Sequence, residues 1–197
     1  MRYLLLLFVL CLASAADLPN TLTPKESAEG WKLLFDGATL GGWETHWATD
    51  WTAENGTLVC SAVERSWLST AASFSDYTLK LEFRGAGNVN SGVFLRSQKE
   101  GQPHITGYEL QIWDYQPAGY NTGSLVGSLK ASPVKILPDQ WNQYEITAKG
   151  DHFHVVLNGK TLLDGNDSKH ASGVIGFQCQ KDNRIAFRNI KLKPLGK

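Results

Sequence analysis

The sequence predicts an all-β fold, a single β-sandwich of two antiparallel sheets with jelly-roll topology. Short alternating or apolar runs follow one another from residue 31 onward, and Gly, Asn, Asp and Pro separate them, as strands and turns require. No strand–helix–strand alternation appears that would indicate a parallel sheet. A chain of 197 residues with 19 glycines and 11% aromatic residues suits one turn-rich domain with a sizeable core.

Residues 1–15 have the pattern of a secretory signal peptide. Arg2 precedes a short apolar run that ends in the small residues at 13–15. The run is too short to span a bilayer comfortably and no other long apolar run follows, so we expect no transmembrane anchor after cleavage. Cys11 follows Leu10, where a lipoprotein signal normally has a small residue, which argues against lipidation. We expect export to a periplasm or to the cell exterior.

Residues 16–30 form a polar N-terminal segment. We place the domain itself at residues 31–197. Within the N-terminal segment, Thr23 and Glu26 have the spacing of a capping box, and Pro24 occupies the first helical position. The pattern predicts a short N-terminal helical turn that ends by Gly30.

The expected strands are short and closely spaced. Asn158-Gly159 and Asn55-Gly56 lie between such runs and are typical of tight hairpin turns. The strands are expected at residues 31–35, 51–53, 57–60, 77–84, 91–97, 107–113, 141–149, 152–157, 161–164, 173–178 and 184–193.

The charge balance argues against nucleic acid as a partner. Lysine plus arginine and aspartate plus glutamate number 19 each, so the chain has no excess of positive charge that would attract nucleic-acid phosphates.

After export the chain would keep two cysteines, Cys60 and Cys179. A disulfide between them is one interpretation in an oxidising compartment, and two separate buried thiols are the other.

The segment GYELQIWDY, residues 107–115, alternates in a way that an ordinary wet face does not explain. As a strand it sets Glu109, Gln111 and Trp113 on one face and Leu110 and Ile112 on the other. Sugars need this mixture, because polar groups bond hydroxyls while aromatic faces cover the C–H side of the ring. The alternation therefore predicts a sugar-binding groove.

The run at 91–97 could extend this face. Val93 and Leu95 fit the core, which leaves Phe94 and Arg96 on the opposite side. His104 lies in the loop before residues 107–113 and is well placed to reach the groove. None of the histidines has the helical spacing of a zinc protease site.

The run at 77–84 could contribute a third strand. Its apolar residues at 79, 81 and 83 fit the core, which leaves Lys80, Glu82 and Arg84 on the other face. If the three strands are neighbours, their polar side chains form one surface. An ordinary solvated face is the alternative for these three residues.

Several segments together resemble the 3-keto-disaccharide hydrolase domain family. The similarity runs in order over nearly the whole mature chain, and the combination is specific where any one motif would be weak. The resemblance implies a concanavalin-like lectin/glucanase jelly roll, common in secreted bacterial proteins, that acts on glycosides oxidised to a ketone at sugar carbon 3. The segments are WKLLFDGATLGGW (31–43), NSGVFLR (90–96), GYELQIWD (107–114), GVIGFQ (173–178) and FRNIKLKPL (187–195).

The chemistry that the resemblance implies needs a base, a cationic group and an acid. A ketone at carbon 3 acidifies the hydrogen on carbon 2, so a base can remove it while the aglycone leaves carbon 1, and water then adds to the enone. We assign Glu109 as the base, Arg96 or a divalent cation as the stabiliser of the enolate, and His104 as the acid. The residues expected to contact the sugar are Gln111, Trp113, Gln178, Glu82, Arg84 and Asn90.

The sequence requires no cofactor. A divalent metal would suit carboxylate and amide oxygens, but no full ligand set is visible in the sequence. One segment departs from the resemblance: members often carry Asp-His-Gly shortly after the glutamine that corresponds to Gln178, and the residues at 179–183 lack that histidine. Three interpretations stay open: a hydrolase or lyase on 3-keto-glycosides, a non-catalytic carbohydrate-binding module, and a structural or adhesion domain.

Overall fold

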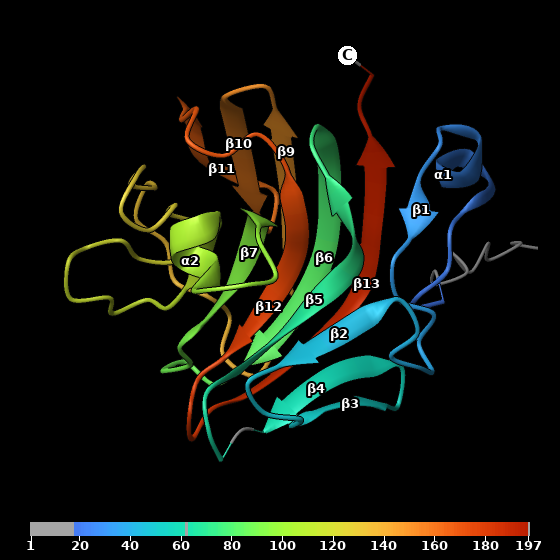
Figure 1. Cartoon of the computed structure of the whole chain (residues 1–197), viewed down its shortest axis with the longest axis horizontal. Helices are drawn as coiled ribbons and strands as arrows, with labels where there is room; N and C mark the ends of the chain where they lie inside the picture. The colour runs from blue at the N-terminus through green and yellow to red at the C-terminus, as the bar shows by residue number, and fades with distance from the viewer. Residues whose placement is uncertain (1–17, 62, 197) are drawn as a thin grey trace, which may run out of the picture.

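Two antiparallel sheets pack face to face in the computed structural model, which describes residues 18–61 and 63–196 (Figure 1). The predicted signal peptide lies outside the described residues. The predicted jelly-roll sandwich is confirmed. Apart from its two sheets, the described part of the chain contains the short helices α1 (Pro24–Ala28) and α2 (Pro103–Thr106).

Sheet A has eight strands. Seven run in the order β11-β10-β9-β6-β13-β4-β3, and β1 pairs with β13 off this path. Their bounds are β1 (Lys32–Leu33), β3 (Trp51–Glu54), β4 (Thr57–Ser61), β6 (Tyr77–Gly85), β9 (Asn142–Lys149), β10 (His152–Leu157), β11 (Lys160–Asn166) and β13 (Arg184–Pro194).

Sheet B has five strands in the order β2-β5-β12-β7-β8. Helix α2 lies at one edge of this sheet, beside β7 and β8 (Figure 1). The bounds are β2 (Trp43–His46), β5 (Ser66–Phe74), β7 (Ser91–Ser97), β8 (Tyr108–Ile112) and β12 (Gly173–Cys179).

The core lies between the two sheets and follows the alternation in the sequence. Leu81 of β6 and Leu110 of β8 are almost fully buried in one apolar cluster, together with the other inward-facing residues of both sheets. Removing this apolar area from water is the main force that holds the sheets together. The side chains at alternate positions are left for the two outer faces.

The N-terminal helical turn forms as the sequence predicts. The Thr23 hydroxyl accepts a hydrogen bond from the backbone nitrogen of Glu26, and the Glu26 carboxylate accepts one from the backbone nitrogen of Thr23. The ammonium of Lys191 donates to both Glu26 oxygens at 2.8 and 2.9 Å, which attaches α1 to β13. Among the described residues, no helix is long and apolar enough to cross a membrane.

A disulfide joins the two sheets. It links Cys60 of β4 in sheet A to Cys179 at the end of β12 in sheet B, with Cα atoms 6.2 Å apart. The two cysteines are 119 residues apart in the sequence. A loop of this length gives a stabilisation of about 4–5 kcal/mol in the chain-entropy model of disulfides.

The observed strands differ from those expected from the sequence in two ways. Strands β2 and β5 were not expected, and both belong to sheet B. The strands at 77–84, 91–97 and 107–113 do not form one surface, because β6 lies in sheet A while β7 and β8 pair in sheet B. Which sheet a strand joins depends on pairing between distant segments, which alternation within one strand does not encode.

Candidate functional site

Two rows of side chains cross the outer face of sheet B, on the side away from the core. The strand register sets the first row as Glu44, Ser69, Gly176, Phe94 and Glu109. The same register sets the second row as His46, Trp67, Gln178, Gly92 and Gln111. We call the surface made by these two rows the site face.

Two glycines make room for the large side chains of the site face. A Cβ atom on Gly92 would lie 3.0 Å from both Cγ and Oε1 of Glu109, so this carboxylate lies directly over the glycine. A Cβ atom on Gly176 would lie 2.9 Å from the indole of Trp67, which crosses β12 at that point. Gly92 of the NSGVFLR segment and Gly176 of the GVIGFQ segment are therefore explained by packing, because a neighbouring side chain lies close to the backbone at each position.

Glu109 is the most strongly perturbed carboxyl group of the site face. It is almost fully buried, and its Oε1 accepts a hydrogen bond from the Gln178 amide at 3.0 Å. Burial raises the pKa of Glu109 from 4.5 to about 7, while the Gln178 hydrogen bond and the charge of Arg65 act in the opposite direction. A carboxyl group with a pKa near neutrality is suited to proton transfer at physiological pH.

Arg65 acts electrostatically both on Glu109 of β8 and on His104 of α2. Arg65 precedes β5, and its charge lowers the pKa of Glu109 and of His104. Burial is the larger cause of the lowered pKa of His104, so the neutral imidazole is favoured. The site therefore combines a carboxyl group, a guanidinium and a neutral histidine.

Aromatic rings cover the other half of the site face. The imidazole of His46 stacks on Trp67 with ring centroids 4.0 Å apart, and Phe94 meets the same indole edge-on at 5.6 Å. Trp47 follows β2, and its ring lies 6.3 Å from that of Trp67 and 4.9 Å from the guanidinium carbon of Arg65. Because Trp47 is 48% exposed, its indole is available to a sugar ring.

The loop between β7 and α2 leans over the site face. Lys99 of this loop forms an ion pair at 2.8 Å with Glu44 of β2, although β5 and β12 separate β2 from β7 in the sheet. The loop also carries the start of α2 and therefore His104. The site face is thus flanked by a segment from the opposite edge of the sheet.

Four buried polar atoms at this site have no hydrogen-bond partner in the described part of the chain. They are Arg65 Nε, Trp67 Nε1, His104 Nδ1 and Gln178 Oε1. Buried polar groups in proteins are normally paired, and leaving one unpaired is costly. A polar ligand on the site face would supply the missing partners.

The structure brings three of the predicted residues together, Glu109, Gln111 and Gln178. Gln111 lies two residues from Glu109 on the same face of β8, where its Oε1 accepts from the backbone nitrogen of Ile112. Trp113 lies just past the end of β8 and is half-buried. Asn90 precedes β7, and its backbone nitrogen donates to the side chain of Asn183.

Arg96 does not lie on the site face. Its guanidinium is fully buried and donates to the backbone oxygens of Ser75, Gly150 and His170 and to the carboxylate of Asp76, at 2.7 to 3.1 Å. The reason is a β-bulge: Arg96 has a φ of 55°, and the pairing of β7 with β12 shifts at this point. The extra residue turns the side chain away from the face that strict alternation predicts.

Glu82 and Arg84 also lie elsewhere. Both are on β6, on the outer face of sheet A, where Glu82 accepts from Arg188 at 2.7 Å and Arg84 packs on Trp141. The two outer faces are on opposite sides of the sandwich, so these residues do not contact a sugar bound at Glu109.

Four residues of the site were not predicted from the sequence: Arg65, Trp67, His46 and Trp47. His46 and Trp67 lie on the two unexpected strands. The run from Ser66 to Thr70 places Trp67 and Leu68 side by side, so its sequence lacks the alternation that identifies a strand. The sequence signal that remains is the tryptophan content of these two segments.

The described residues gather no group of three or more His, Cys, Asp or Glu side chains that could hold a metal ion. The divalent metal considered from the sequence stays a prediction.

Solved structures with a similar fold include three bacterial proteins. A protein of Parabacteroides distasonis, provisionally named a glycosyl hydrolase, is 23% identical with a TM-score of 0.80, covering 91% of this chain and 100% of its own. A second protein of that organism with the same provisional name is 25% identical with a TM-score of 0.70, covering 84% of this chain and 99% of its own. The carbohydrate-binding module CBM66 of Bacillus subtilis is 21% identical with a TM-score of 0.60, covering 76% and 94%.

Comparison with curated proteins gives no match. Residues 30–193, most of the chain, match the family described as the 3-keto-alpha-glucoside-1,2-lyase-like domain. The match includes both rows of the site face and the glycines beneath them, and it confirms the family resemblance seen in the sequence. The chain belongs to the 3-keto-alpha-glucoside-1,2-lyase-like domain family.

Proposed function

We propose that the chain cleaves 3-keto-glycosides on the site face. Glu109 takes the proton from sugar carbon 2, and the electron pair of that bond passes through the enolate to form the carbon 1–carbon 2 double bond. The glycosidic oxygen leaves carbon 1 and is protonated to the free alcohol. Water then adds across the double bond of the enone and releases the free 3-keto sugar.

The observation that supports this proposal most strongly is the raised pKa of the buried Glu109 carboxyl group, together with its hydrogen bond to Gln178. Its pKa of about 7 makes the carboxylate a competent base at neutral pH, and the Gln178 hydrogen bond holds one oxygen in place. Burial of Glu109 limits the water around the group, which strengthens the charge interactions at the reacting carbon.

Arg65 is the cation best placed to stabilise the enolate, in the role first assigned to Arg96. Its Nε is buried without a partner, and its charge acts on Glu109. His104 stays the proposed donor to the leaving oxygen. In its neutral form it can donate only through the ring nitrogen that carries the proton.

Export is part of this proposal. Two observations support it, the signal-peptide pattern of residues 1–15 and the disulfide between Cys60 and Cys179. Disulfides persist in oxidising compartments such as a periplasm or the cell exterior. An exported enzyme would meet glycosides outside the cytoplasm.

A second candidate function is carbohydrate binding without catalysis. One observation favours it: the segment that follows Gln178 lacks the histidine that family members often carry, and Cys179 is occupied by the disulfide. The similarity to a carbohydrate-binding module agrees with this alternative at the level of fold.

Turnover of 3-keto-trehalose or a 3-keto-glucoside by the purified mature protein tests the proposal. We expect release of free sugar, loss of release in Glu109→Gln, and wild-type release in Glu145→Gln, which makes the same chemical change at a half-exposed site on sheet A. Because the base must be ionised, kcat/KM should rise as the pH increases through about 7. Parallel reactions with a chelator test the divalent metal.

Two outcomes would count against the proposal. Undiminished release by Glu109→Gln would remove Glu109 from the role of base. Saturable sugar binding with no release at any pH, with or without added divalent metal, would favour the binding module.

A further inference from the structure

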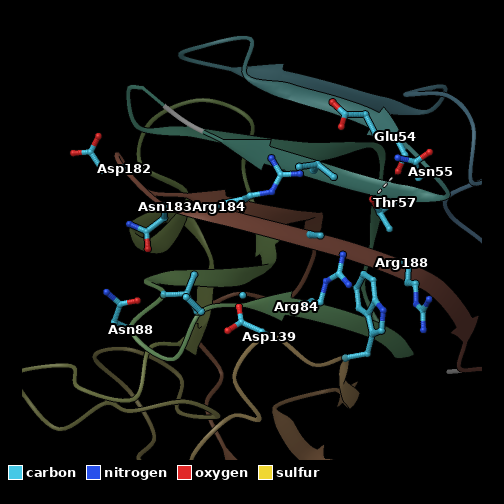
Figure 2. Close-up of a pocket in the computed structure, with 16 residues that line it drawn as sticks. Glu54, Asn55, Thr57, Arg84, Asn88, Asp139, Asp182, Asn183, Arg184 and Arg188 are labelled. Carbon is cyan, nitrogen blue, oxygen red and sulfur yellow. Dashed lines mark hydrogen bonds between the residues drawn. The ribbon is translucent and has the colours of Figure 1, made fainter.

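A polar hollow lies on the outer face of sheet A, on the opposite side of the sandwich from the site face (Figure 2). Its volume is about 760 Å³, within the range of small-molecule sites. Strands β3, β4, β6 and β13 and the loops at 86–89, 139–141 and 182–183 supply its lining.

Short side chains between long ones create the hollow. Ala186 of β13 pairs with Val59 of β4 on one side and with Arg84 of β6 on the other, and Ala186 and Val59 form a low floor. Arg184 and Arg188 lie two residues before and after Ala186 on the same strand, so three guanidinium groups surround this floor. Figure 2 shows these three arginines around the hollow.

Trp141 holds two of these arginines in position. The guanidinium carbons of Arg84 and Arg188 lie 4.7 and 4.1 Å from the centre of its ring. A guanidinium that packs flat on a ring keeps its N–H donors in its own plane and free for other acceptors. The Arg188 guanidinium donates to Glu82, whereas the Arg84 guanidinium has no hydrogen bond or ion pair within the described part of the chain. Arg84 therefore presents oriented donors to the hollow.

The remaining polar groups make the lining suitable for an uncharged polyol. Three carboxylates accompany the three arginines, so the formal charges of the lining cancel and neither an anion nor a cation is favoured. Three asparagines add amide donors and acceptors. Hydroxyl groups both donate and accept, so they can bond guanidinium, amide and carboxylate groups that lie side by side.

We propose that this hollow is a second saccharide-binding site, which takes an uncharged oligosaccharide independently of the site face. Arg84 is its principal donor and Asp139 an acceptor at its edge. Because the two sites lie on opposite outer faces, an oligosaccharide held by the hollow leaves the site face open. A second site of this kind would keep the protein on a glycan while the site face contacts another sugar.

Titration of the ¹⁵N-labelled full-length mature protein tests the inference. The probes are maltotriose, cellotriose and laminaritriose, with trigalacturonate as the anionic comparator. For at least one neutral trisaccharide we expect saturable shifts of the amides of Gly85 and Asn183, which line the hollow. Arg84→Ala should weaken this binding about 10- to 100-fold, as expected for loss of hydrogen bonds from a charged donor. Glu109→Gln, on the other sheet, should leave the binding unchanged.

Asp139→Asn provides a second variant with an almost unchanged shape. Asp139 has a φ of 57°, a conformation that asparagine also tolerates, so this variant should keep the wild-type melting temperature and lose affinity. The inference is overturned if no neutral trisaccharide causes saturable shifts at millimolar concentration, or if only trigalacturonate binds. Binding that Glu109→Gln abolishes and Arg84→Ala leaves intact would overturn it as well. None of these results depends on turnover of a 3-keto-glycoside.

Discussion

Glu109→Gln should stabilise the protein at alkaline pH and have almost no effect at acid pH. In the unfolded chain the carboxyl group ionises at its ordinary pKa of 4.5, whereas burial in the folded chain raises this pKa to about 7. Between these values the folded state binds more protons than the unfolded state, so the free energy of unfolding falls as the pH rises. The loss begins near pH 4.5 and is complete slightly above pH 7.

The size of the effect follows from the two pKa values. Each tenfold change in a proton-binding constant corresponds to about 1.4 kcal/mol, so ionised Glu109 lowers the free energy of unfolding by about 3 kcal/mol above pH 8. An uncharged amide does not incur this cost, and its oxygen can still accept the hydrogen bond from Gln178. For a domain of this size the gain corresponds to an increase in melting temperature of about 6–12 °C.

Thermal unfolding followed by circular dichroism at pH 4 and pH 8.5 measures this difference directly. Other titrating groups affect the wild type and the variant alike, so the comparison at each pH isolates Glu109. Glu145→Gln serves as the control, because a half-exposed carboxylate should show little change at either pH. An equal change at both pH values, or a lower melting temperature of Glu109→Gln at pH 8.5, would refute the reasoning that burial controls the pKa of Glu109.

Three further predictions concern packing and covalent structure. Gly176→Ala places a methyl group against the Trp67 indole and a backbone oxygen, so the free energy of unfolding should fall by about 1–3 kcal/mol and the near-ultraviolet circular dichroism of the tryptophans should change. Arg96→Met removes a buried guanidinium with four acceptors and should lower the free energy of unfolding by about 3–5 kcal/mol in urea titrations, whereas a role limited to catalysis predicts unchanged stability. Replacing Cys60 and Cys179 together by serine should cost about 2–5 kcal/mol, and a reductant should then have no additional effect on the melting temperature of that variant, in contrast to the wild type.

The parts of the site that lie on a strand with a regular polar–apolar alternation in its sequence were predictable. The alternation of residues 107–113 correctly separates Leu110 and Ile112 from Glu109 and Gln111, because each strand residue points opposite to its neighbour. The same logic fails at Arg96, where a bulge inserts one residue and reverses the side on which the guanidinium lies.

The aromatic half of the site could not be predicted for a different reason. In residues 66–70 the apolar residues Trp67 and Leu68 are adjacent, so the sequence has no alternation that would identify strand β5. Arg65 lies in a loop, and its proximity to Glu109 depends on how the β4–β5 connection folds against sheet B. The distance between a loop and a strand far away in the sequence depends on how the whole sandwich packs, and the local sequence pattern does not encode it.

The disulfide has a consequence for how the protein is prepared. Cys179 is the chain neighbour of Gln178, which holds the Glu109 carboxylate, and the sulfur bridge anchors that end of β12 to sheet A. The position of Gln178, and with it the hydrogen bond to Glu109, is thereby tied to oxidation of the two thiols. Protein produced in a reducing cytosol would reach the same topology with a looser anchor beside Gln178, and air oxidation or refolding with a glutathione couple would restore it.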